Sequence, residues 1–226
     1  MVRLLALIVL TGSAVAVAQT PPKKVETDAE RFAKWEKDVA AIEKRLQQKP
    51  APESPVVFAG SSSIVRWKLP PSFPGKPVVN VGFGGSQIRD CTNFVPRIIT
   101  PLKPSTVVFY AGDNDVGSKR TPEQVLADYK AFVTAVHKDS PKAKVLFVSI
   151  KPSLSRWAMF DAQTKANALV KQFSSADPRL GYIDVVPRML GADGKPNPEH
   201  FVKDGLHMTD KGYEVWAAVV NKALGW

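Results

Sequence analysis

The chain has 226 residues, 44% hydrophobic and 23% charged, enough to bury one sizeable hydrophobic core in one domain, or at most two small ones. This composition excludes intrinsic disorder and collagen-like repeats. The single cysteine, Cys91, excludes an intramolecular disulfide and a cysteine-based zinc cluster. The formal net charge of +10 favours anionic partners. The basic residues are scattered, so we expect a basic surface and no nucleic-acid partner.

The first eighteen residues have the pattern of a secretory signal peptide. Arg3 provides a short positive region, Leu4 to Leu10 form an apolar core, and Ala16 to Ala18 supply small residues for cleavage before Gln19. The alternative is an uncleaved membrane anchor, but the apolar run is shorter than the ~20 residues that span a bilayer. We therefore predict a periplasmic or secreted protein, cleaved after about Ala18, with no transmembrane segment in the mature chain.

Residues 19–53 are predicted to form a leader followed by an amphipathic helix over residues 28–48. Thr27 and Glu30 have the spacing of a capping box at the start of this helix. Apolar side chains then recur at intervals of three or four residues, at Phe32, Trp35, Val39, Ile42 and Leu46. This stripe either packs on the sheet of the same chain or pairs with another subunit, so the oligomeric state stays open.

Residues 54–226 alternate between short apolar segments and longer helical ones. Five apolar runs have the pattern of strands covered on both faces, as in a parallel sheet. They are Val56–Ala59, Val78–Val81, Thr106–Tyr110, Val145–Ile150 and Tyr182–Val185. Helices are predicted to begin at Pro122, behind a capping box, to cover Ser155–Ser175, and to follow Thr209. The alternation indicates a three-layer α/β/α sandwich, in which ligands bind at the carboxyl ends of the strands.

Two glycine- and serine-containing segments follow the first two predicted strands. Gly60-Ser61-Ser62-Ser63 places hydroxyl groups on a turn between a strand and a helix, which suits a nucleophile beside backbone N–H donors. An ordinary turn with a helix cap has the same composition, and the three serines alone do not show which one reacts. The stretch from Asn80 to Ser86 allows close approach of backbone to a ligand, or forms a plain turn.

Two further segments carry polar side chains suited to acyl transfer. The loop after the third predicted strand contains Asn114, whose amide can donate to an oxyanion or form an Asx turn. Asp204 precedes His207 by three residues, so its carboxylate can hold one ring nitrogen while the other takes a proton from a serine. A structural or helix-capping histidine is the alternative. His137 and His200 lack such a setting, and we expect both at the surface.

In order, these four segments resemble the signature blocks of the SGNH (GDSL) hydrolases, and the chain is most similar to the bacterial branch related to platelet-activating-factor acetylhydrolase. The resemblance covers about residues 54–224, and four blocks in order are far more specific than any one. It implies a flavodoxin-like domain over residues 54–226, with five parallel strands and helices on both faces. One position departs from the family pattern: the residue before the nucleophile, usually Asp, is Ser61. Asp115 follows the family pattern and is interpreted as structural.

The resemblance also implies a role for each matching residue. Ser62 matches the nucleophile, His207 the general base and Asp204 the carboxylate that orients it. Gly85, Asn114 and the backbone N–H of Ser62 match the oxyanion hole. The implied reaction is acyl transfer to Ser62 followed by hydrolysis with water, and it requires no metal or organic cofactor.

The expected substrate is a short-chain acyl ester, chiefly acetyl, on a carbohydrate or another envelope polymer. No long apolar lid is present in the sequence, which favours a short acyl group. In the loop after the fourth predicted strand, Arg156 and Trp157 are candidates to contact such a substrate, or they are a surface residue and a core residue. The alternatives are a lysophospholipase or thioesterase acting on lipid acyl groups, an acyltransferase with another acceptor, and a catalytically silent envelope-binding module.

Overall fold

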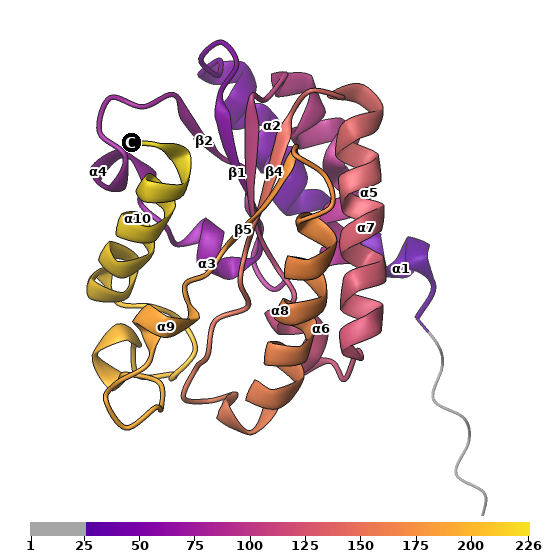
Figure 1. Ribbon diagram of the computed structural model, residues 1–226. Coiled ribbons are helices and arrows are strands. Elements are labelled where there is room, and N and C mark those ends of the chain that lie inside the picture. The colour runs from indigo at the N-terminus through magenta and orange to yellow at the C-terminus, as the bar shows by residue number, and fades with distance from the viewer. Residues whose placement is uncertain (1–25) are drawn as a thin grey trace, which may run out of the picture.

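The computed structural model describes residues 26–226 (Figure 1). The predicted signal peptide and the first part of the predicted leader lie outside the described residues. In the described part of the chain, five parallel strands form one sheet in the order β2-β1-β3-β4-β5. They are β1 Val56–Gly60, β2 Val78–Asn80, β3 Thr106–Tyr110, β4 Lys144–Val148 and β5 Leu180–Ile183. This order confirms the flavodoxin-like sandwich and places a topological switch point between β1 and β3.

Helices cover both faces of the sheet (Figure 1). On one face lie α1 Asp28–Ala33, α2 Glu36–Gln48, α5 Ile88–Ile98, α7 Pro122–Asp139 and α8 Phe160–Ser174. On the other lie α3 Ser62–Val65, α4 Leu69–Ser72, α9 Val186–Met189 and α10 Asp210–Leu224. The short helix α6, Asp113–Gly117, follows β3, and η1 Thr100–Leu102, η2 Trp157–Met159 and η3 Pro198–His200 are 3-10 turns.

Alternate strand residues supply the two hydrophobic cores. Phe109 on β3 faces α7 and stacks on Phe132, with ring centroids 3.8 Å apart. Its neighbour Tyr110 faces the other way and meets the fully buried Trp216 of α10 edge-on at 4.7 Å. This alternation follows from the two-residue period of a strand. The strand ends are therefore held rigidly between two packed layers.

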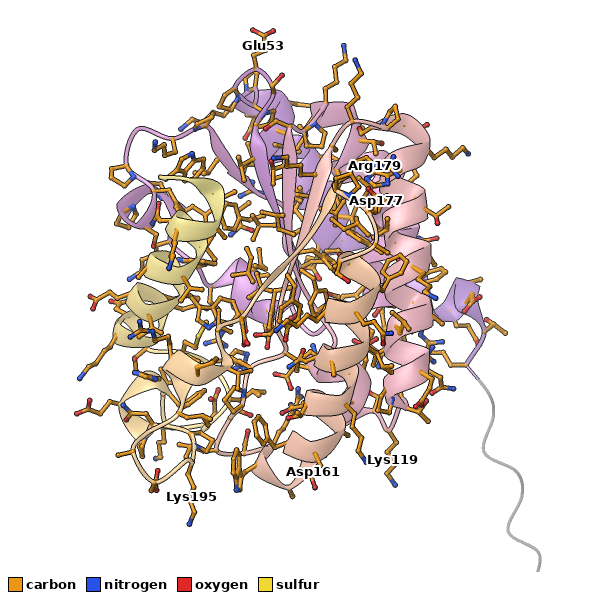
Figure 2. All side chains as sticks on the ribbon, viewed as in Figure 1. Glu53, Lys119, Asp161, Asp177, Arg179 and Lys195 are labelled. Carbon is orange, nitrogen blue, oxygen red and sulfur yellow. The ribbon has the colours of Figure 1, made fainter. Side chains whose placement is uncertain are left out.

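The strands run downward in the view of Figure 2, and the segments that follow their carboxyl ends fill the lower half of the molecule. Glu53, just before β1, and Arg179, just before β5, lie at the upper edge, whereas Lys119, Asp161 and Lys195 lie at the lower edge (Figure 2). Segments that follow the strands therefore gather at the lower edge.

Two predicted strands have wrong boundaries, and β5 covers Leu180–Ile183 rather than residues 182–185. β4 stops at Val148 rather than at residue 150, because Ile150 pairs with a side chain instead of a strand: its N–H donates to Asn167 Oδ1 at 2.8 Å and its carbonyl accepts from Asn167 Nδ2 at 2.9 Å. α5 was not predicted. It has a buried apolar face, but Pro96 lies inside it and obscures the helical signal.

The predicted helix over residues 28–48 is two helices, α1 and α2, separated by a turn at residues 34–35. Phe32 meets Phe94 of α5 edge-on at 6.3 Å, and Trp35 meets Phe83 at 5.6 Å. The turn lets these two rings reach different partners. The apolar stripe thus packs within the chain, chiefly against α5.

A buried ion pair also attaches this N-terminal segment to α5. The Nε atom of Arg31 lies 2.6 Å from Asp90 Oδ1, and Nη2 donates to Asp90 Oδ2 at 2.7 Å. Asp90 is fully buried and its Oδ2 also accepts from the backbone N–H of Gln87 at the start of α5. Removal of the arginine leaves a buried carboxylate without its counter-charge.

We expect Arg31→Met to lower the free energy of unfolding by about 3–5 kcal/mol, the usual cost of breaking a buried pair from one side. The control is Lys34→Met, whose ion pair with Glu26 is exposed, and we expect a loss below about 1 kcal/mol there. Urea unfolding followed by tryptophan fluorescence measures both. Equal losses in the two variants would contradict the prediction.

Candidate active site

Ser62 lies where β1 meets α3, on a turn packed against the end of β3. Gly60, the last residue of β1, has φ +134°, and a Cβ atom there would lie 1.9 Å from the carbonyl oxygen of Tyr110 at the end of β3. Only glycine fits this approach. The N–H of Ser61 then donates to the same carbonyl at 3.0 Å, and Ser62 begins α3 with its side chain half-buried.

A loop before α10 brings His207 to this serine. The Nε2 atom of His207 lies 3.0 Å from Ser62 Oγ, and Nδ1 lies 2.6 Å from Asp204 Oδ2. The second carboxylate oxygen of Asp204 accepts the N–H groups of Leu206 and His207, both at 2.9 Å. These bonds hold the carboxylate in a fixed orientation. The structure therefore joins all three sequence-predicted residues in one chain of hydrogen bonds.

Asp204 is set to remain ionised. Desolvation opposes its charge, but the hydrogen bonds from the His207 ring and from the two backbone N–H groups outweigh it and hold the pKa of Asp204 well below its usual range. An ionised carboxylate keeps the proton of His207 on Nδ1, so Nε2 is free to accept a proton from Ser62. The arrangement suits general-base activation of a serine.

Gly85 and Asn114 lie in the segments after β2 and β3, the two strands that flank β1 in the sheet. Gly85 is exposed with φ +79°, a conformation that favours glycine, and a Cβ atom on it would lie 3.3 Å from the ring of Trp35. The Nδ2 atom of Asn114 donates to the carbonyl of Ser86 at 3.1 Å. Asn114 and the Gly85–Ser86 loop therefore lie side by side.

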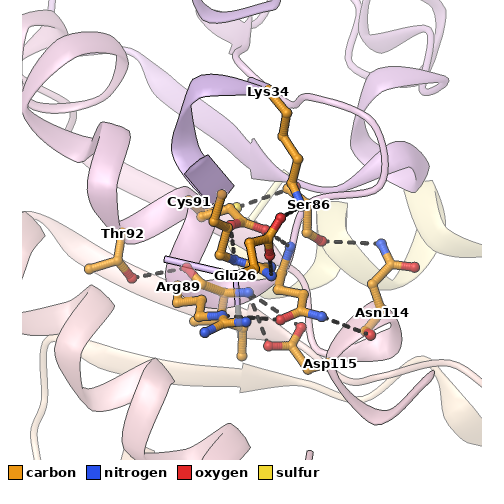
Figure 3. A network of polar contacts seen from close by, with 12 residues as sticks. Glu26, Lys34, Ser86, Arg89, Cys91, Thr92, Asn114 and Asp115 are labelled. Carbon is orange, nitrogen blue, oxygen red and sulfur yellow. Dashed lines mark hydrogen bonds and ion pairs between the residues drawn. The ribbon is translucent and has the colours of Figure 1, made fainter. Parts of the chain in front are cut away.

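A wider polar network supports this pair of loops. Figure 3 follows it from Glu26 and Lys34 of the N-terminal segment to Asn114 and Asp115 of α6. Asp115 is fully buried, and the backbone N–H of Ile88 donates to its two oxygens at 3.2 and 3.3 Å. The carboxylate thus caps α5, which agrees with its interpretation as a structural residue.

Arg156, one of the two candidates to contact a substrate, is paired with side chains of α6. Its Nη1 lies 2.7 Å from Asp113 Oδ1 and its Nη2 donates to Asn114 Oδ1 at 3.0 Å. The ring of Trp157 stacks on Phe160, with centroids 4.6 Å apart and an interplanar angle of 21°. Both side chains are therefore engaged within the protein.

Buried charges that the sequence did not predict lie next to Asn114. Lys151 is 1% exposed, and its ammonium lies 3.2 Å from Asp113 Oδ2. Gln163 donates to the other carboxylate oxygen of Asp113, also at 3.2 Å. Burial opposes the charge of Asp113, but Lys151 and Arg156 lower its pKa below the usual value. A lysine and an aspartate that are 38 positions apart carry no local signal of this contact.

Of the two remaining histidines, His200 does not lie at the surface as predicted. His200 is 5% exposed, so its predicted surface position is wrong; it is buried in η3 just before the His207 loop. His137 is half-buried near the opposite end of the sheet and pairs with the carbonyl of Ala143 at 3.0 Å. Neither contacts Ser62. In the described residues no group of three or more His, Cys, Asp and Glu side chains is arranged to hold a metal ion.

Comparison with known proteins decides the family. Residues 57–215 match the GDSL-like Lipase/Acylhydrolase family. The chain belongs to this family. It is 29% identical to human platelet-activating factor acetylhydrolase IB subunit alpha1 over 169 residues, 71% of each chain. The protein is accordingly a GDSL-type esterase or acylhydrolase.

Solved structures confirm the fold of this GDSL-type chain. A GDSL-like lipase from Bacteroides thetaiotaomicron superposes with a TM-score of 0.66 at 22% identity, covering 86% of this chain and 97% of the other. A catalytic mutant of an acetylxylan esterase from Geobacillus stearothermophilus gives a TM-score of 0.64 at 16% identity, with 79% and 97% covered. At these identities the likeness extends to the fold alone.

The buried Asp115 predicts a pH-dependent stability. Desolvation, together with the nearby charge of Asp128, raises its pKa to about 7. Its folded pKa lies above the unfolded value of about 3.9, so its stabilising contribution is complete below that value and is lost as pH rises through about 7.

We expect Asp115→Asn to become more stable relative to wild type as pH rises from 4 to 8, by at most about 1.4 kcal/mol per pH unit. The amide oxygen keeps an acceptor for Ile88. Urea unfolding at several pH values measures the difference between the two proteins. A pH-independent difference would contradict the raised pKa.

Proposed function

We propose that this GDSL-type protein is an exported serine esterase that hydrolyses short-chain acyl esters, chiefly acetyl esters, through Ser62, His207 and Asp204. The observation that carries the proposal is the continuous chain from Asp204 Oδ2 to His207 Nδ1 at 2.6 Å and from His207 Nε2 to Ser62 Oγ at 3.0 Å. Both distances are short enough for hydrogen bonds. Such bonds are required between a nucleophile and its general base, and between that base and the group that orients it.

In the proposed reaction Ser62 Oγ attacks the ester carbonyl while its proton passes to His207 Nε2. Asp204 stabilises the imidazolium that forms. The tetrahedral intermediate collapses as the imidazolium gives that proton to the leaving alcohol oxygen, which leaves the acyl group on Ser62. A water molecule, deprotonated by His207, then attacks the acyl-enzyme. The imidazolium returns this proton to Ser62 Oγ as the ester bond breaks, which releases the carboxylic acid and restores Ser62 and His207.

The oxyanion of each tetrahedral intermediate is proposed to accept hydrogen bonds from the backbone N–H groups of Ser62 and Gly85 and from Asn114 Nδ2. A carboxamide nitrogen carries two hydrogens. One of them is donated to the Ser86 carbonyl at 3.1 Å, and we assign the other to the oxyanion. Donors held in place before the reaction cost no reorganisation when charge develops.

An open site supports a small acyl group on a bulky alcohol. The Asp204 side chain is 46% exposed and Gly85 is exposed, so solvent reaches both residues of the proposed site. Two surface cavities, of about 600 Å³ beside α7 and α8 and about 420 Å³ between α4 and α10, include none of the proposed catalytic residues. A carbohydrate or another envelope polymer fits such an open face.

The human relative supports an acetyl substrate, since its name describes an acetylhydrolase. Export rests on the signal-like pattern of residues 1–18, which lie outside the described residues. Within residues 26–226, no helix combines the length and apolar character needed to cross a membrane. We propose a periplasmic or secreted location on the sequence pattern.

We expect the mature protein to hydrolyse p-nitrophenyl acetate faster than the butyrate, octanoate or palmitate esters. Ser62→Ala should lower kcat at least about 10³-fold and abolish labelling by a fluorophosphonate. The matched control is the neighbouring Ser63→Ala, which should keep the label. Equal labelling of Ser62→Ala and wild type would overturn the proposal, and a preference for palmitate would favour a lipid acyl substrate.

We expect Asn114→Ala to lower kcat by about 10²–10³-fold with little change in KM, because the lost donor acts on the transition state. Asn93→Ala is a suitable control, since Asn93 is exposed on α5. Steady-state kinetics with p-nitrophenyl acetate measures both. An unchanged kcat in Asn114→Ala would remove Asn114 from the oxyanion hole.

A further inference from the structure

Arg156 reaches α6 from the loop after β4 and holds two consecutive residues at once. Its Nη1 lies 2.7 Å from Asp113 Oδ1, and its Nη2 donates to Asn114 Oδ1 at 3.0 Å. The guanidinium also lies against Gly117, where a Cβ atom would be 3.2 Å from Cζ. The absence of a side chain at residue 117 leaves room for this contact.

The contact with Asn114 determines which end of the carboxamide faces the Gly85–Ser86 loop. The oxygen and the NH2 group of an asparagine are nearly the same size, so its two orientations differ mainly in their hydrogen bonds. A guanidinium has donors only, and it can bond the carboxamide oxygen but not the NH2 group. Arg156 therefore directs Asn114 Nδ2 toward Ser86.

The arginine is itself fixed by buried partners. Asp113 is 4% exposed and also contacts Lys151 and Gln163, both at 3.2 Å. Two cations face one carboxylate, so the cluster of Asp113, Lys151 and Arg156 has a net positive charge when all three are ionised. A charged donor on the carboxamide oxygen also polarises the amide and strengthens its N–H groups as donors.

We propose that Arg156 is a positioning residue for the oxyanion hole, which holds the Asn114 carboxamide with its N–H group toward the developing oxyanion. This inference rests on the proposed esterase function. Arg156 acts through Asn114 and not by contact with the substrate, so its loss should lower kcat and leave KM nearly unchanged.

The first test compares Arg156→Met with Arg179→Met in hydrolysis of p-nitrophenyl acetate by the mature protein. Arg179 pairs with Asp177 at the opposite edge of the molecule (Figure 2). Arg179→Met therefore also removes one ion pair and serves as the control. We expect kcat to fall about 10- to 100-fold in Arg156→Met, with KM changed less than about threefold, and neither value to change in Arg179→Met. A higher KM with unchanged kcat would restore Arg156 to a substrate-binding role and overturn the proposal.

A double-mutant cycle separates positioning from a general structural effect. In the Asn114→Ala background, Arg156→Met should cost less than about twofold in kcat, because the group that it positions is gone. An equal loss in both backgrounds would overturn the proposal. For Arg156→Ala, millimolar guanidinium should restore part of kcat, since the ion supplies the missing donor. Melting temperatures of all variants identify any that fail to fold.

One readout does not depend on activity. The side-chain amide signals of Asn114 in a nitrogen–proton NMR spectrum are assigned by their absence in Asn114→Ala. We expect them to be displaced from free-amide positions in wild type and to move toward those positions in Arg156→Met. Unmoved signals would overturn the positioning role. Failure of wild type to exceed Ser62→Ala in hydrolysis would instead refute the proposed function, and the NMR result would still decide the role of Arg156.

Discussion

The site depends on one constraint, the pairing of β1 with β3 in the middle of the sheet. Val56 pairs with Thr106 and Gly60 with Tyr110, so the two strands end level with each other. After β1 the chain continues toward one edge of the sheet, and after β3 it continues toward the other edge. A crevice therefore opens at the carboxyl ends of these two strands. Ser62 and Asn114 follow these two ends within a few residues, and the glycine at position 60 permits the close approach. The Ser62–His207 contact and the Asn114 loop are arranged around this fixed edge.

Buried charge is the second feature on which the proposed oxyanion hole depends. A buried ion pair is poor evidence for stability, because desolvation of its members offsets most of their attraction. The cluster of Asp113, Lys151 and Arg156 is better explained by geometry: its hydrogen bonds leave Asn114 one orientation. Open solvent would not restrict a carboxamide in this way. The same low-polarity surroundings that make the cluster costly also strengthen the donors that it orients.

The N-terminal helices belong to the same packed unit as the family's matched region. That match begins at residue 57, yet Val39 and Ile42 of α2 are buried in the core that also contains Phe109 of β3. Trp35 lies against Gly85, and Arg31 is held by the buried Asp90. Residues before the matched region therefore support the loop that carries a proposed oxyanion donor.

The sequence by itself determined the features that depend on residues close together along the chain. These are the five apolar strands, the capping boxes at Thr27 and Thr121, and the order of the segments that carry Ser62, Asn114 and His207. These signals are local, because strand period and helix caps involve residues a few positions apart. Only the tertiary structure decided which distant side chains meet. Arg156 bonds Asn114 across 42 positions, and Asn167 replaces a strand partner of Ile150 across 17. Such contacts depend on how the layers pack, and no pattern along the chain encodes them.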